Sequence, residues 1–162
     1  MITSKKSPIT WFAVLDSRRA QFYQRKPMHK EPDQSLSHNG RRLEPIFDTS
    51  LVAESIEDYE IGRHQLGRVF ESANPPRHSP SSHTGISEEI KLRFIRKIVE
   101  TLEKCHAAKA FDQLVLVAPA KIIGILRKSL SADIKKSIIT EVVKDLTHHQ
   151  SEALSGFLAA VA

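Results

Sequence analysis

Cysteine is nearly absent from this chain, and its scarcity excludes a scaffold held together by disulfides. Cys105 is the only cysteine among the 162 residues, so no internal disulfide can form. It lies within a strongly helical pattern, which favours a buried or half-buried thiol over a catalytic one. A chain of this length buries enough surface to fold without such crosslinks.

Long apolar runs are also missing. No stretch approaches the roughly 20 apolar residues that a membrane-spanning helix needs. The opening "MITSKKSPITWFAVLDS" has no apolar segment followed by a small-residue cleavage site. We therefore expect a cytoplasmic protein with no membrane insertion.

The common motifs of catalysis and cofactor binding are absent. The sequence contains no Walker A loop, no Rossmann glycine signature and no G-x-S-x-G elbow. Aromatic residues make up only 6%, and Trp11, Tyr23 and Tyr59 are the only ones besides phenylalanine. So few stacking platforms do not favour sequence-specific reading of RNA. We expect no cofactor and no metal, and a binding protein rather than an enzyme.

The composition is that of an ordinary globular protein with an excess of positive charge. Hydrophobic residues make up 40% and charged residues 27%, which fits a single domain over residues 1–162. The formal net charge is +5. That charge is compatible with an anionic partner such as RNA or the ribosome.

The first half of the chain predicts strands. "TWFAVLD", Thr10–Asp16, is almost continuously apolar, as in a strand covered on both faces. A polar turn leads into "AQFYQRK", Ala20–Lys26, which predicts an antiparallel hairpin. "RLEPIFDTSL" predicts a weaker third strand near an edge, because Pro45 cannot donate to a central ladder.

The second half alternates helices and strands. Residues 86–111 show apolar residues at helical spacing, with Ser87, Glu88 and Glu89 suited to a helix start. "QLVLVA" predicts a buried parallel strand, and Pro119 suits the start of the helix that follows it. "IITEVVKDL" predicts a further strand. A closing helix comes next, in which Thr147 and Gln150 are spaced as a capping box. The order predicts an α/β fold: a mixed sheet of about five strands, with an N-terminal antiparallel hairpin and parallel βαβ units, flanked by helices.

A long loop over residues 53–85 separates the two halves. It lacks sustained periodicity, although "SIEDYEIGR" suits a brief helix. Loops of this length tend to be functional or disordered. Arginine forks suit phosphate oxygens and histidines gain charge readily, so the loop is either an anion-binding or RNA-binding segment or a solvated surface. The binding candidates are Arg63, Arg68, Ser72, Arg77, His78 and His83.

Polar residues also follow the first and last predicted strands. Asp16 ends one, and Asp145, Thr147 and His148 end the other. The carboxyl ends of strands are favoured ligand positions in α/β sheets. A metal-dependent hydrolase or nuclease using these carboxylates and the loop histidines is an alternative, but Asp112 is the only other acid in a suitable place. In the other interpretation, Asp16 caps the hairpin turn and Asp145 binds turn N–H groups.

A second basic group follows the middle strand. It comprises Lys121, Arg127, Lys128, Lys135 and Lys136. Such a group is either the solvated face of a helix or part of one basic surface shared with the loop arginines.

Four stretches resemble the bacterial host attachment protein family, in that family's order. They are "TWFAVLDSRRAQFYQ", "LGRVFESANPPRH", "FDQLVLVAPAKIIGILRKSLS" and "EVVKDLTHH". Within the loop, Gly67-Arg68, Ser72 and Arg77-His78 match the family pattern, whereas Asn74-Pro75-Pro76 stands where many relatives have glycines.

The resemblance implies both a fold and a cellular setting. The family is similar to the middle domain of archaeal and eukaryotic peptide-chain release factors and of Pelota, which is related in shape to ribonuclease H. This kinship implies work at or near the ribosome, whereas the family name implies an adaptor in attachment to host cells. Release factors act through a Gly-Gly-Gln loop, and this chain contains no Gly-Gly-Gln, so peptide release by that means is not expected.

Overall fold

The computed structural model describes residues 7–27, 41–48, 50–60, 80–149 and 151–159. Their core is one mixed sheet in the order β3-β2-β1-β5-β6, with β4 pairing β2 beside this path. The strands are β1 Thr10–Leu15, β2 Arg19–Pro27, β3 Arg41–Pro45, β4 Leu51–Val52, β5 Gln113–Ala118 and β6 Ile138–Val143. The predicted hairpin and parallel units are confirmed, because β1 pairs β2 antiparallel and β5 lies parallel to both β1 and β6.

The two central strands explain the continuous apolar runs. Every residue of β1 is buried, and so is β5 from Leu114 onward. Alternate side chains of a strand point to opposite faces, so both faces of this sheet must be covered. The helices that cover them are α2 Pro80–Ala107, α3 Ala120–Ser129, α4 Ala132–Ser137 and α5 Ser151–Ala159.

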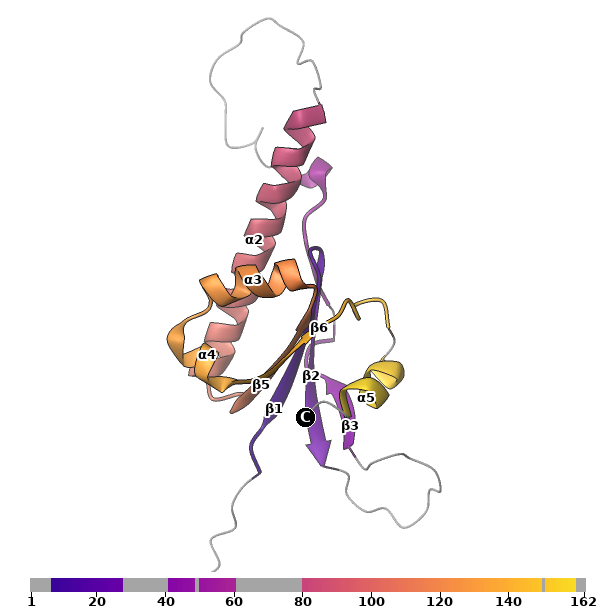
Figure 1. Ribbon diagram of the computed structural model, residues 1–162, viewed down its shortest axis with the longest axis vertical. Helices are drawn as coiled ribbons and strands as arrows, with labels where there is room; N and C mark the ends of the chain where they lie inside the picture. Colours follow the sequence, from indigo (N-terminus) through magenta and orange to yellow (C-terminus); the bar gives the residue numbers. More distant parts are fainter. Residues whose placement is uncertain (1–6, 28–40, 49, 61–79, 150, 160–162) are drawn as a thin grey trace, which may run out of the picture.

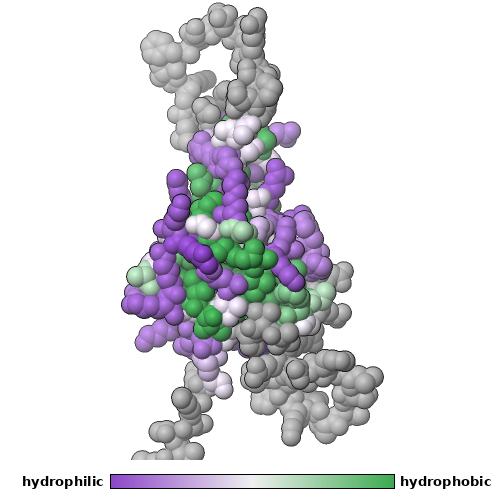
Figure 2. Space-filling view, viewed as in Figure 1, coloured by the Kyte–Doolittle hydropathy of each residue, from purple (hydrophilic) through white to green (hydrophobic). Residues whose placement is uncertain are grey.

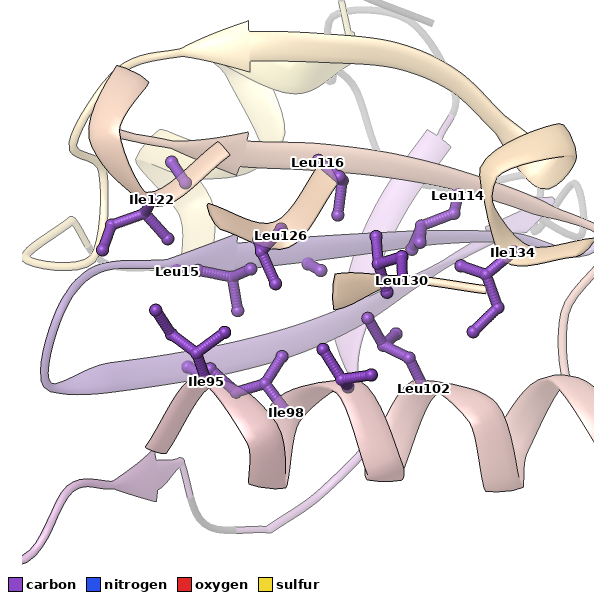
Figure 3. Packing of buried hydrophobic residues seen from close by; sticks show 14 of the residues in the cluster. Leu15, Ile95, Ile98, Leu102, Leu114, Leu116, Ile122, Leu126, Leu130 and Ile134 are labelled. Atoms are coloured by element: carbon purple, nitrogen blue, oxygen red, sulfur yellow. The ribbon is translucent and has the colours of Figure 1, made fainter. Parts of the chain in front are cut away.

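The larger core lies between the sheet and α2, α3 and α4. Leu15 and Leu116 point from the strands toward Ile98 and Leu102 of α2 and Leu126 of α3 (Figure 3). The opposite face, which carries Phe12, Val14 and Val115, packs against Leu154 and Leu158 of α5. Figure 1 shows α2, α3 and α4 on one side of the sheet and α5 on the other.

Several predicted boundaries are wrong, whereas one brief element is confirmed. Helix α2 begins at Pro80 rather than near Ser87, so residues 80–85 belong to the helix and not to the loop. The weak third strand divides into β3 and β4, and residues 46–48 form a bend between them. The helix after Pro119 is followed by a separate short helix, α4. The brief helix expected in "SIEDYEIGR" is present over residues 56–60.

The topology gathers three strand ends on one side. Because β1, β5 and β6 are mutually parallel, their carboxyl ends lie along the same edge of the sheet. The beginning of α2 extends beyond that edge, and the short helix over residues 56–60 lies next to it (Figure 1). None of the described helices combines the length and hydropathy required to cross a bilayer.

Leu116→Ala tests the importance of the sheet–helix core. Leu116 is 0% exposed in the middle of β5. Truncation removes apolar contacts and leaves a cavity, so the free energy of unfolding should fall by about 2–5 kcal/mol. Leu92→Ala, at a side chain of α2 that is 41% exposed, is the matched control and should change it by less than about 0.5 kcal/mol. Equal effects in denaturant titrations would contradict this assignment of the core.

Candidate functional site

The Asp16 carboxylate organises the turn between β1 and β2. Its Oδ1 accepts hydrogen bonds from the backbone N–H groups of Arg18 at 2.5 Å and Arg19 at 2.6 Å. The backbone N–H of Asp16 donates to the Arg19 carbonyl at 2.9 Å. The predicted role of Asp16 as the cap of the hairpin turn is therefore confirmed. This cap leaves the side chains of Arg18 and Arg19 exposed beside the strand ends.

Thr147 joins that turn to the segment after β6. Its hydroxyl oxygen lies 2.6 Å from Asp16 Oδ2 and 2.9 Å from Asp145 Oδ1. A hydroxyl has one hydrogen, so it donates to one carboxylate at a time. Asp145 Oδ1 also accepts the Thr147 backbone N–H at 3.3 Å, as the turn-binding interpretation predicts.

The carboxylates come together although their strands are not neighbours. Strand β5 lies between β1 and β6. Leu146 packs into the core on the α5 face, and this fixes the segment on which Asp145 and Thr147 lie on either side of it. The predicted capping box is wrong, because α5 begins at Ser151 and the buried Thr147 side chain turns to the carboxylates instead.

Folding lowers the pKa of Asp16. Partial burial is the largest single influence and raises the pKa. The hydrogen bonds from Thr147 and from the backbone of Arg18 and Arg19, with the charge of His148, together outweigh burial. The pKa therefore lies below its ordinary value of 3.8, and Asp16 carries its negative charge at neutral pH.

A cleft of about 570 Å³ opens over these strand ends. Cations reach it from the hairpin turn, α2 and α3, while acids occur only after β1 and β6. The residues that line it are Asp16, Ser17, Arg18, Arg19, Lys91, Pro119, Lys121, Ile122, Asp145 and His148. Arg and Lys thus outnumber Asp in the lining by four to two, which gives the cleft a positive balance.

Glu88 brings the two lysines toward each other. Its Oε1 lies 2.7 Å from Lys91 Nζ and 3.5 Å from Lys121 Nζ. The hydrogen bond and charge of Lys91, with a smaller contribution from Lys121, lower the pKa of the exposed Glu88 carboxyl. Glu88 therefore joins α2 to α3 and does not act as the helix-start residue that the sequence predicted.

A smaller hollow of about 100 Å³ leads from the cleft along α2. It shares Ser17, Arg18 and Lys91 with the cleft and continues to Ile56 and Ser87. The surface beside the strand ends thus extends to the short helix over residues 56–60, which directly precedes residues 61–79.

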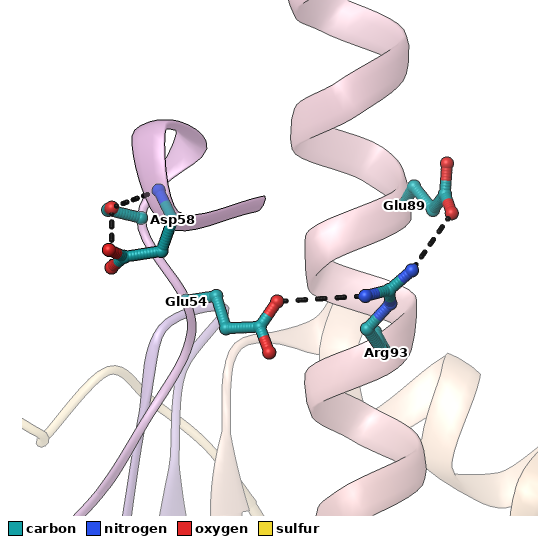
Figure 4. A network of polar contacts seen from close by, with 5 residues as sticks. Glu54, Asp58, Glu89 and Arg93 are labelled. Atoms are coloured by element: carbon teal, nitrogen blue, oxygen red, sulfur yellow. Dashed lines mark hydrogen bonds and ion pairs between the residues drawn. The ribbon is translucent and has the colours of Figure 1, made fainter. Parts of the chain in front are cut away.

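That short helix is fixed to α2 by a polar network. Ser55 caps its start, since the Ser55 Oγ accepts the Asp58 N–H at 3.1 Å. Arg93 of α2 lies 3.7 Å from Glu54 and 3.4 Å from Glu89 (Figure 4). The Arg93 guanidinium also lies 4.8 Å from the ring centroid of the buried Tyr59. The chain therefore enters residues 61–79 from a defined position beside α2.

One group of side chains suits a metal ion by type. Single ligand atoms of Asp16, Asp145 and His148 lie within 4.8 Å of one another. However, both oxygens of Asp16 already accept hydrogen bonds. Asp112 cannot supply a third carboxylate, because it precedes β5 and accepts the Ile9 N–H at 2.8 Å, at the opposite edge of the sheet.

The predicted site residues divide into two groups. The structure brings together the strand-end candidates Asp16, Asp145, Thr147 and His148. The loop candidates Arg63, Arg68, Ser72, Arg77 and His78 lie outside the described residues, as does the side chain of His83, whose backbone is in α2. Sequence reasoning missed Arg18, Arg19 and Lys91 as lining residues. The polar run "DSRR" directly after the first strand was the available signal for two of them.

Comparisons with known proteins point to one family. The family model described as "Protein required for attachment to host cells" matches residues 11–158. An uncharacterized protein of Rickettsia prowazekii (strain Madrid E) is 24% identical over 101 residues, which cover 61% of this chain and 67% of that protein. The matched residues include all the strands except the start of β1, and all the residues that line the cleft.

Thr147→Val tests the connection between the two strand ends. Valine keeps the shape but leaves Asp16 without its hydroxyl donor, so the free energy of unfolding at neutral pH should fall by about 1–3 kcal/mol. A carboxylate whose pKa is lowered by folding stabilises the fold above its unfolded-state pKa, and this stabilisation disappears as pH falls through the folded-state pKa. The difference from wild type should therefore shrink below pH 3.8.

Thr101→Val is the control for that substitution. The Thr101 hydroxyl donates to the Lys97 carbonyl within α2, at 2.8 Å, and binds no carboxylate. This variant should change stability by less than about 0.5 kcal/mol at every pH. A Thr147→Val effect that is equally small, or independent of pH, would show that the hydroxyl does not hold the two segments together.

Proposed function

Because the chain belongs to the family of proteins required for attachment to host cells, we propose a molecular role for it within that family. The protein is a non-enzymatic binding domain for a polyanionic partner, either RNA or the ribosome. The cleft at the strand ends is the proposed contact surface. The proposal rests on one observation: cations from three separate elements line a single cleft. It does not require the protein to touch the host cell.

The chemistry of the lining suits phosphate. Arginine presents a planar fork of N–H donors that matches phosphate oxygens, and lysine adds a compact point charge. Arg18 and Arg19 are exposed, and the Lys121 side chain is 74% exposed, so all three are accessible to a large ligand. Because Arg and Lys outnumber Asp in the lining, the cleft has a positive balance that attracts anionic partners.

Asp16 supports the proposed binding surface indirectly, by holding the turn between β1 and β2. Its carboxylate is occupied by the turn amides and the Thr147 hydroxyl, so it fixes the backbone that carries Arg18 and Arg19. The hollow that continues to Ile56 extends the same surface toward residues 61–79. We include Arg68, Arg77 and His78 of that segment in the proposed contact surface.

Replacing Arg18, Arg19 and Lys121 together by alanine tests the proposal. Wild-type protein should bind a labelled RNA hairpin and co-sediment with ribosomes at low salt, and added salt should abolish both. The triple variant should bind at least about tenfold more weakly. Its log K should also fall less steeply with log salt, by about 0.9 for each duplex phosphate that the variant no longer neutralises. Fluorescence anisotropy over a salt series measures both quantities.

A variant with the same reduction of charge provides the control. Arg96, Lys97 and Lys104 are exposed cations of α2 outside the cleft, and their joint replacement by alanine should leave binding close to wild type. Replacing Arg68, Arg77 and His78 by alanine should weaken binding as the cleft variant does. Equal weakening in the cleft and control variants, or no binding at low salt, would overturn the proposal.

A second candidate function is metal-dependent hydrolysis of phosphoesters. The grouping of Asp16, Asp145 and His148 favours it. It ranks second because two-metal chemistry needs more carboxylates than this group supplies, and Asp16 is already engaged.

Turnover distinguishes the two functions. We expect RNA and phosphodiester substrates to remain intact with Mg²⁺ or Mn²⁺ under conditions in which the protein binds RNA. The control is Asp145→Asn, which keeps an acceptor for the Thr147 N–H. Turnover that Asp145→Asn abolishes without loss of folding would establish the hydrolase instead.

A further inference from the structure

Strand β6 forms an edge that no strand covers among the described residues. It pairs only with β5, at the end of the strand order. Edge strands present unpaired backbone N–H and C=O groups, which makes them templates for pairing with another extended chain. A register shift between Leu114 and Val115 interrupts its start, and the register is regular from Thr140 to Val143.

This edge also exposes apolar side chains. Ile139 is 45% exposed and Val143 is 60% exposed, although both belong to a strand next to the buried β5. Glu141 lies between them and does not point freely into solvent, because Arg127 of α3 binds its two oxygens through Nε and Nη2. In the view of Figure 2, hydrophobic residues gather in the middle of the molecule, in the region where Figure 1 shows β6. Hydrophilic residues surround them.

The part of the chain that contains β6 and the helices α3 and α4, both of which contact β6, is basic. From Pro119 to Asp145, six residues are Lys or Arg and three are Asp or Glu. Two of the three acids are already paired, since Asp133 binds Lys136 and Glu141 binds Arg127. Lys128 and Lys135 are exposed and form no ion pair with any described residue.

These features together select the kind of partner. The open backbone favours an extended segment that adds as a further strand, and Ile139 and Val143 favour apolar side chains on that segment. Lys128 of α3 and Lys135 of α4 lie on the two helices that contact β6, and their charges favour acidic side chains between the apolar ones. A second copy of this chain is disfavoured, because pairing β6 with itself brings the same basic segments together.

We propose that β6 is a docking edge for an acidic, extended segment of another protein, in which apolar and acidic residues alternate. No residue of β6 lines the strand-end cleft, and the proposal does not depend on the function proposed for that cleft. It assigns a role to the second basic group of the sequence, of which only Lys121 lines the cleft.

Synthetic peptides test the proposal directly. The probe is a short capped peptide in which valine alternates with glutamate, and the matched peptide carries lysine in place of glutamate. The full chain should bind the glutamate peptide at least about tenfold more tightly, because like charges placed together are strongly unfavourable. In amide NMR spectra, the shifts should centre on Ile138–Val143.

Substitutions that leave the charge unchanged distinguish peptide binding at β6 from non-specific electrostatic attraction. Ile139→Thr with Val143→Thr keeps β-branched side chains but reduces apolar contact, and should weaken binding roughly tenfold. Val52→Thr is the control, because Val52 is a similarly exposed strand residue, 56%, on β4. Arg18→Ala with Arg19→Ala should leave peptide binding unchanged, which keeps this test independent of the cleft.

Several results would overturn the docking edge. Equal affinity for the two peptides, or no binding at low salt, would contradict it. Amide shifts centred away from β6 would also contradict it. So would a Val52→Thr control that weakens peptide binding as much as the β6 variant does. Sedimentation that shows a dimer dissociated by the β6 substitutions would assign the edge to a second copy and contradict the proposal.

Discussion

The structure depends on two central strands, β1 and β5, whose side chains are almost all apolar. β1 and β5 are buried on both faces, so the sheet must be sandwiched between helices, and polar chemistry is confined to the strand ends. Parallel pairing of β1, β5 and β6 then brings three carboxyl ends to the same edge. The position of the cleft follows from the burial of β1 and β5, because polar side chains can reach solvent only beyond the ends of these strands.

Asp16 shows how the constraint shapes chemistry. A carboxylate at the end of a buried strand needs donors, and it finds them in the next turn and in Thr147. Using the carboxylate in this way fixes the positions of Arg18 and Arg19, but it leaves Asp16 poorly suited to catalysis. The same residue that suggests a metal site by its type therefore supports, by its hydrogen bonds, the turn that carries the proposed binding surface.

The sequence predicted the parts of the fold that periodicity controls. The apolar runs of β1 and β5 and the helical spacing of Ile90, Phe94 and Ile98 marked buried elements correctly. The start of α2 escaped prediction because residues 80–85 carry no apolar stripe, and helical periodicity is visible only where a face is buried. The resemblance to release-factor middle domains remains an expectation, as do the roles of Arg68 and Arg77. The sequence predicted that Asp16, Asp145, Thr147 and His148 lie at strand ends, and the structure brings them together. It did not predict the hydrogen bond between Thr147 and Asp16, because the two residues are 131 positions apart and their strands are not neighbours.

If the strand-end cleft binds a polyanion, Arg18 and Arg19 of the hairpin turn should contact it first. The decisive measurement follows the side-chain Nε–Hε NMR signals of Arg18 and Arg19 while a structured RNA is added at low salt. We predict that these two signals shift first and saturate together, and that added salt reverses the change. Signals of Arg18 and Arg19 that stay unchanged while RNA binds, with shifts confined to arginines outside the cleft, would contradict the proposed binding surface.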